Sequence, residues 1–143
     1  MILFLNTDKA VGGLIPYKEL ASVPIYEIAF RNKALTKVNM LSKITDFLDI
    51  MSYEEDLFLL IINDLDDAFH NLSQMEDKHV IESNKKLFHI ITEELLNIGH
   101  RIIYFTPGTS PADQDILELS NLDGFTILHD EVKLYNVIIN EFR

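Results

Sequence analysis

Polar side chains follow the two most apolar runs of the chain. Residues 2–5 and residues 57–62 each predict a strand that is buried on both faces of a sheet. Open parallel sheets bind ligands at the edge where the strands reach their carboxyl ends. We therefore predict a ligand-binding edge formed by Asn6, Asp8, Asn63, Asp64 and Thr106.

Candidates for catalysis at this edge are few. Thr7 supplies a hydroxyl and Asp8 a carboxylate after the first strand, and His129 follows the last predicted strand. The chain has no G-x-S-x-G nucleophile elbow, no H-E-x-x-H zinc motif and no phosphate-binding glycine pattern. Threonine at a strand end is commonly capping or turn chemistry. These features favour a protein that is not an enzyme.

The acidic residues of the chain are its candidate metal ligands. Carboxylate oxygens are the ligands that Mg²⁺ prefers, and Asp8, Asp64, Asp66 and Asp67 could supply them. Their spacing lacks the glycine and the terminal glutamate of an EF-hand loop, and acidic loops are usually solvated surface. We expect no cofactor, with Mg²⁺ as the one metal that these residues would suit.

Composition sets the class of protein. The chain has 143 residues, 48% of them hydrophobic, which suits a single α/β domain spanning residues 1–143. It has no cysteine, so disulfides, thiolate nucleophiles and zinc–thiolate sites are excluded. No apolar run approaches the roughly 18–20 residues of a membrane helix. We expect a cytoplasmic protein that does not enter a membrane.

Charge suggests the kind of partner. The formal net charge of −11 disfavours binding to nucleic acid and favours a basic protein. The segment 64–78 is predicted to be a mobile acidic loop, with a short helix near 66–72, and to be the main contact surface for that partner. Its acidic residues are Asp64, Asp66, Asp67, Glu76 and Asp77. The alternative is an acidic surface that only keeps the protein soluble.

Strand and helix patterns alternate along the chain. Predicted strands cover residues 2–5, 25–30, 57–62, 101–105 and 125–128. Predicted helices cover residues 17–21, 35–51, 80–98, 112–119 and 132–142. Alternation of this kind predicts a three-layer α/β sandwich with a mainly parallel five-stranded sheet, Rossmann-like or flavodoxin-like. The expected strand order is 2-1-3-4-5, the commonest at this size.

The hydrophobic pattern also predicts which side chains form the core. The sheet is expected to contribute Leu3, Leu5, Ile25, Leu59, Ile61, Ile103, Phe105 and Ile127. The helices are expected to cover it with Leu41, Ile44, Leu48, Ile91, Leu95 and Ile138.

The chain from the third strand onward resembles the SGNH (GDSL-type) hydrolases. In that family a buried strand ends in G-x-N-D, a long helix follows, and the next strand runs into a T-P loop. Asn63-Asp64, the helix ending near Gly99, and Thr106-Pro107 stand at those places. The resemblance implies an SGNH-like fold with Asn63 as the oxyanion-hole residue.

The family's catalytic blocks are altered in this chain. The G-D-S block falls on Asn6-Thr7-Asp8, so Asp8 replaces the nucleophilic serine and the glycine is missing. The final D-x-x-H has no match, and His129 is the only candidate for its histidine. The resemblance implies a degenerate member, or a residual esterase with Thr7 or Asp8 as an atypical nucleophile.

A weaker resemblance is to the response-regulator receiver domains. Thr106 matches the switch threonine after the fourth strand. Ile61 stands at the phosphoacceptor aspartate and Asp130 at the conserved lysine, which implies a pseudo-receiver signalling domain. Of these alternatives we favour a non-catalytic acidic interaction protein, either a regulator or an inhibitor such as a toxin-neutralising immunity protein.

Overall fold

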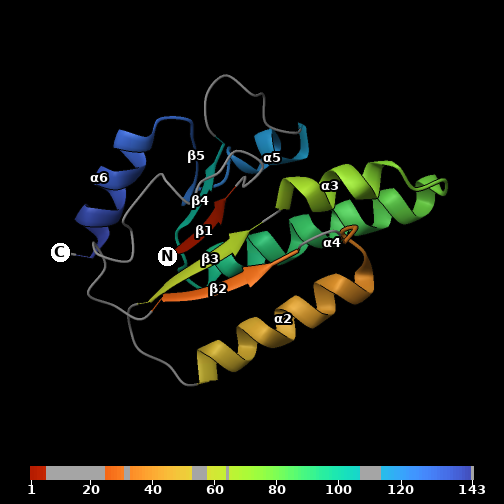
Figure 1. Ribbon diagram of the computed structural model, residues 1–143, viewed down its shortest axis with the longest axis horizontal. Helices are drawn as coiled ribbons and strands as arrows, with labels where there is room; N and C mark the ends of the chain where they lie inside the picture. The colour runs from red at the N-terminus through yellow and green to blue at the C-terminus, as the bar shows by residue number, and fades with distance from the viewer. Residues whose placement is uncertain (6–24, 31–32, 53–57, 64, 107–113, 143) are drawn as a thin grey trace.

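The apolar runs of the sequence become the strands of one parallel sheet in the computed structural model (Figure 1). The structure describes residues 1–5, 25–30, 33–52, 58–63, 65–106 and 114–142. The strands are β1 (Ile2–Leu5), β2 (Ile25–Ala29), β3 (Leu59–Asn63), β4 (Ile102–Phe105) and β5 (Phe125–Leu128). All neighbouring strands pair in parallel.

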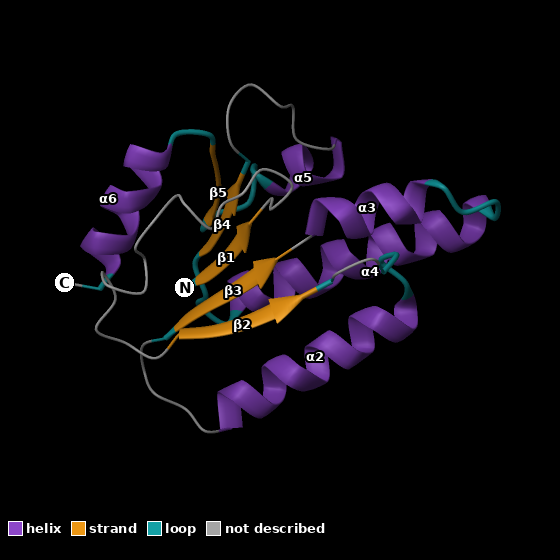
Figure 2. Cartoon of the chain, viewed as in Figure 1, coloured by secondary structure: helices purple, strands orange, loops and turns teal. Residues whose placement is uncertain are grey.

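Helices cover both faces of this sheet (Figure 2). Successive side chains of a strand point to opposite faces, so each strand contributes to two separate apolar clusters. One cluster joins the sheet to α2 (Lys37–Ser52), α3 (Leu65–Ser73), α4 (Lys78–Asn97) and α5 (Gln114–Leu119). The other joins it to α6 (Glu131–Glu141). The predicted three-layer α/β class is confirmed.

The strand order differs in one exchange from the predicted 2-1-3-4-5. The sheet runs β2-β3-β1-β4-β5, so β1 is central and β3 separates it from β2. Both β1 and β3 are apolar on both faces, so their composition does not distinguish the two orders. Contacts between β2 and β3 decide the order: the Asn63 carbonyl accepts a hydrogen bond from the Phe30 backbone N–H at 3.1 Å.

Most of the predicted sheet core is confirmed. Leu3, Leu59, Ile61, Ile103 and Phe105 are fully buried. Ile127 is half-buried against the cluster that faces α2 to α5. The side chains of Leu5 and Ile25 lie outside the described residues.

The prediction that Leu41 of α2 faces the core is wrong. Val38 is 75% exposed and Leu41 is exposed, whereas Met40 and Phe47 are buried. Two faces of the helix carry apolar residues, one with Val38 and Leu41 and the other with Met40 and Phe47. The helical periodicity alone therefore does not show which face is buried. Phe47 packs its ring against Phe58, with ring centroids 6.5 Å apart, and faces the core together with Met40.

The inward faces of α4 and α6 are confirmed in part. Ile138 is buried, and Ile91 and Leu95 pack half-buried against the core. Ile98, the C-cap of α4, is exposed, and so are Val132 and Tyr135 of α6, because the buried row of α6 runs through Leu134 and Ile138. The side chains of Ile44 and Leu48 are not among those described.

The predicted mobile loop 64–78 is largely a packed helix. Helix α3 buries Leu65, Ala68, Phe69 and Leu72 in the core, because these residues recur at helical spacing. Asp77 begins α4: its carboxylate accepts hydrogen bonds from the backbone N–H groups of His79 and Val80, at 2.9 and 3.4 Å. A residue that sequence analysis placed in a partner surface is therefore a helix cap.

The orientation of α2 predicts unequal effects of two neighbouring truncations. Met40→Ala removes a buried side chain and should lower the free energy of unfolding by about 2–4 kcal/mol. Leu41→Ala truncates an exposed side chain and should cost less than about 1 kcal/mol. Urea denaturation of both variants measures the difference, and a larger loss from Leu41→Ala would contradict the orientation described.

Candidate functional site

Three of the predicted edge residues lie at the carboxyl ends of the strands. Asn63 ends β3 and pairs in register with Leu5 of β1. Thr106 directly follows β4, and His129 directly follows β5. The remaining candidates at this edge, Asn6, Thr7, Asp8 and Asp64, lie outside the described residues.

Asn63 uses its side chain within the sheet. It is buried, and its amide nitrogen donates a hydrogen bond to a carboxylate oxygen of Glu27 on β2. A carboxylate is a strong acceptor for such a donor. The bond links β2 to β3 on the face covered by α6.

His129 and Thr106 hold the ends of β4 and β5 together. The Thr106 backbone N–H donates to the Leu128 carbonyl at 3.0 Å, and His129 Nδ1 lies 3.0 Å from the Thr106 carbonyl oxygen. Because a carbonyl oxygen only accepts, Nδ1 carries the proton in this contact. The imidazole therefore has a defined tautomer and a structural partner.

A groove with acidic walls lies on the other side of the fold from these bonds. We define the acidic groove by Glu93, Leu96, Asn97, Leu122 and Asp123. It has a volume of about 460 Å³ and lies between the last turns of α4 and the turn that leads into β5. Leu96 and Leu122 are half-buried and contribute apolar surface to the same groove.

The electrostatic setting of the acidic groove is one-sided. Residues 87–132 contain eight acidic residues and a single Lys or Arg, which is Arg101. Arg101 is bound to Glu141 of α6, with Nη1 to Oε2 at 3.1 Å, and so belongs to the opposite face of the sheet. Within the groove, Glu93 Oε1 lies 2.8 Å from His89 Nε2 one turn earlier in α4.

Gly124 allows the turn to approach α4 closely. Its φ of +90° lies in the region that favours glycine, and a Cβ built there would lie 3.3 Å from Cδ2 of Leu96. Its carbonyl also accepts a hydrogen bond from the Ile102 backbone N–H at 2.9 Å. Gly124 thus helps to bring the turn that carries Asp123 close to Leu96 of α4.

Two titratable groups with shifted pKa values lie at the amino edge of the sheet. The His100 ring lies 5.7 Å from the ring centroids of both Phe47 and Phe58. Burial lowers the pKa of His100 below its ordinary 6.5, and the α-ammonium of Met1 lowers it further. Burial also lowers the pKa of that α-amino group, opposed by the negative charge of Glu141.

Within the described ranges, no three His, Asp or Glu side chains converge in a way that could hold a metal ion. Among the helices described, none combines the length and the apolar composition needed to cross a membrane.

Comparison with protein-family models, with curated protein sequences and with solved structures gives no significant match. The proposals below therefore rest on the residues and geometry of this chain.

The acidic groove was missed in the sequence because its walls come from segments far apart along the chain. Glu93 belongs to a helix and Asp123 to a turn, and neither follows a buried strand at its carboxyl end. The one available signal was the near-absence of Lys and Arg across residues 87–132. Of the residues predicted to bind a partner, Glu76 is exposed at the turn between α3 and α4.

The lowered pKa of His100 predicts loss of stability in acid. Its neutral form is favoured in the folded protein, so its contribution is complete above about pH 6.5 and is lost as pH falls through the lower folded pKa. His100→Gln should flatten the decline of the melting temperature between about pH 7 and pH 5. His70→Gln, at an exposed position, is the control and should keep the wild-type slope. Equal slopes for wild type and His100→Gln would contradict this assignment.

Two glycines with positive φ separate backbone strain from close contact. Gly99→Ala, at φ +101° with open space around the new Cβ, should cost about 1–2 kcal/mol from strain alone. Gly124→Ala adds the contact with Leu96 and should cost at least as much, while moving Leu96 in the acidic groove. Thermal unfolding and the Leu96 methyl resonances measure both effects. A smaller loss at Gly124, with unchanged Leu96 resonances, would show that the turn does not depend on this contact.

Proposed function

We propose that this protein is a non-catalytic acidic interaction protein that binds a basic protein partner, as a regulator or as an inhibitor of the immunity-protein type. The observation that carries the proposal is the acidic groove, which is lined both by the acidic residues Glu93 and Asp123 and by the apolar residues Leu96 and Leu122.

This arrangement suits a Lys or Arg side chain of a partner. Such side chains have an apolar stem and a charged head, and they bury the stem along apolar surface. Leu96 and Leu122 would contact the stem, while Glu93 and Asp123 would accept charge-assisted hydrogen bonds from the head. The Asn97 amide supplies a further carbonyl acceptor at the groove.

The charge of the whole chain supports the same proposal. A net charge of −11 attracts a basic protein over a distance and raises the association rate at low salt. This long-range electrostatic attraction does not by itself define a binding site. The groove adds a local apolar and acidic surface to which the partner can be fixed after the encounter.

The polar residues of the carboxyl edge support a non-catalytic role. The Asn63 amide donates to Glu27 and His129 Nδ1 bonds the Thr106 carbonyl, so these groups have structural partners. The pseudo-receiver alternative would place its phosphoacceptor at Ile61, which is fully buried in the sheet. The alternative of a residual SGNH-like hydrolase depends on Thr7 or Asp8 as nucleophile and on Asn63 as oxyanion donor.

A charge-matched pair of double variants tests the groove. The basic partner is first captured from a lysate of the source cells at about 50 mM salt and identified by mass spectrometry, and its association is then measured by biolayer interferometry. Glu93→Gln with Asp123→Asn should slow association and speed dissociation about three- to tenfold. At about 0.5 M salt the difference in association rate should nearly vanish, because the charges are screened.

The control removes the same charge elsewhere. Glu76→Gln with Glu82→Gln neutralises two exposed acids at the α3–α4 end of the molecule and should have little effect on dissociation. Equal effects of both double variants would show that only the overall negative charge, and not the acidic groove, contributes to binding. A larger effect of the control would move the interface to the segment 64–78. Turnover of short-chain p-nitrophenyl esters that is abolished by Asn63→Ala would instead establish the hydrolase.

A further inference from the structure

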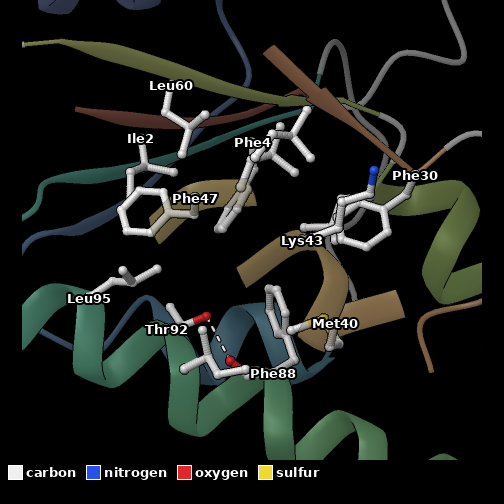
Figure 3. Close-up of a pocket in the computed structure, with 14 residues that line it drawn as sticks. Ile2, Phe4, Phe30, Met40, Lys43, Phe47, Leu60, Phe88, Thr92 and Leu95 are labelled. Carbon is white, nitrogen blue, oxygen red and sulfur yellow. Dashed lines mark hydrogen bonds between the residues drawn. The ribbon is translucent and has the colours of Figure 1, made fainter. Parts of the chain in front are cut away.

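An apolar cavity lies between the sheet, α2 and α4 (Figure 3). We name it the α2 cavity. Ile2, Phe4 and Leu60 of the sheet border it on one side, and Phe47 of α2 and Phe88 of α4 border it from the helices. Its volume is about 70 Å³, roughly half that of a cavity known to hold benzene in a protein core.

The interior of the α2 cavity offers no polar group that needs a partner. Thr92 is the one lining residue with a hydroxyl, and that hydroxyl donates to the Phe88 carbonyl at 2.8 Å. An apolar cavity of this kind stays dry and accepts apolar groups. Its size corresponds to a chain of roughly three carbon atoms, by comparison with the six of benzene.

Lys43 makes one end of the cavity positively charged. It lies on the inward row of α2, between Met40 and Phe47, where an apolar residue is expected. Its side chain is only 24% exposed, and Nζ lies 5.8 Å from the Phe30 ring centroid. In Figure 3 its stem runs beside Phe30 and carries the nitrogen away from the apolar interior.

The ammonium of Lys43 is only loosely paired with a neighbouring acid. Asp46 Oδ2 lies 3.9 Å from Nζ, at the outer limit of an ion pair, and its side chain is 52% exposed. An exposed contact of this length contributes little and can be exchanged for a better-placed anion.

We propose that the α2 cavity binds a short aliphatic carboxylate, with its alkyl end in the cavity and its carboxylate on Lys43. The occupant follows from two observations: the lining accepts only an apolar chain, and the charge at its end selects an anion. The volume restricts the occupant to a short chain rather than a long lipid tail. The proposal is independent of the partner bound at the acidic groove.

The experiment is a titration of the ¹³C-methyl-labelled protein with butanoate, whose alkyl part has three carbon atoms, compared with butan-1-ol and butylamine. Butanoate should shift the methyl resonances of Ile2, Leu60 and Met40 in a saturable way, and leave Leu134 and Ile138 on the opposite face unchanged. Butan-1-ol should bind about three- to tenfold more weakly and butylamine more weakly still, because neither carries a negative charge that can pair with Lys43.

Two pairs of variants test separately the charge of Lys43 and the free volume of the α2 cavity. Lys43→Met keeps the stem and should reduce the affinity for butanoate to that for butan-1-ol, whereas Lys37→Met, exposed on the same helix, should leave it unchanged. Thr92→Leu should fill the cavity and abolish the shifts, whereas the isosteric Thr92→Val should keep them.

The proposal is overturned by either of two results. One is the absence of saturable shifts at the cavity methyl groups with every probe, which would make the cavity a dry packing void. The other is equal affinity for the three probes together with no effect of Lys43→Met, which would show non-specific partition of apolar chains. Should Thr92→Leu fail to fold, the Lys43 and Lys37 pair decides the result alone.

Discussion

The structure depends on burying a parallel sheet on both of its faces. Backbone groups of parallel strands pair only with one another, and their side chains alternate between the two faces, so each face must be covered by apolar helices. Ile2 and Leu3, adjacent in β1, illustrate this: both are fully buried, yet they belong to separate apolar clusters. The remaining features of the protein are consequences of how helices meet this requirement.

Many polar side chains at the edges of the sheet and at the helix starts hold the secondary-structure elements together. At the carboxyl edge, Asn63 joins β2 to β3 through Glu27, and His129 bonds the end of β4. At the helix starts, Asp77 and Asp130 accept hydrogen bonds from backbone N–H groups that would otherwise lack partners. Residues that suggest chemistry in a sequence thus have ordinary roles in holding the elements together.

The surfaces proposed to bind ligands arise where the packing is incomplete. The acidic groove lies where the turn at Gly124 approaches Leu96 near the end of α4. The α2 cavity exists because α2 directs Lys43, whose head must reach solvent, into a row otherwise occupied by Met40 and Phe47. The acidic groove combines apolar surface with negative charge, and the α2 cavity combines apolar surface with positive charge.

The sequence by itself determined the positions and types of most elements, the α/β class and the helix stop at Gly99, because these depend on local periodicity and backbone preference. It did not determine the order of β1 and β3, since both are apolar throughout, or which row of α2 faces inward, since both rows carry apolar residues. It also could not bring Glu93 and Asp123 together, because no local pattern links a helix to a distant turn. Only tertiary packing decided these features: strand pairing, the contact of Phe47 with Phe58 and the approach of Gly124 to Leu96 each join residues that are distant along the chain.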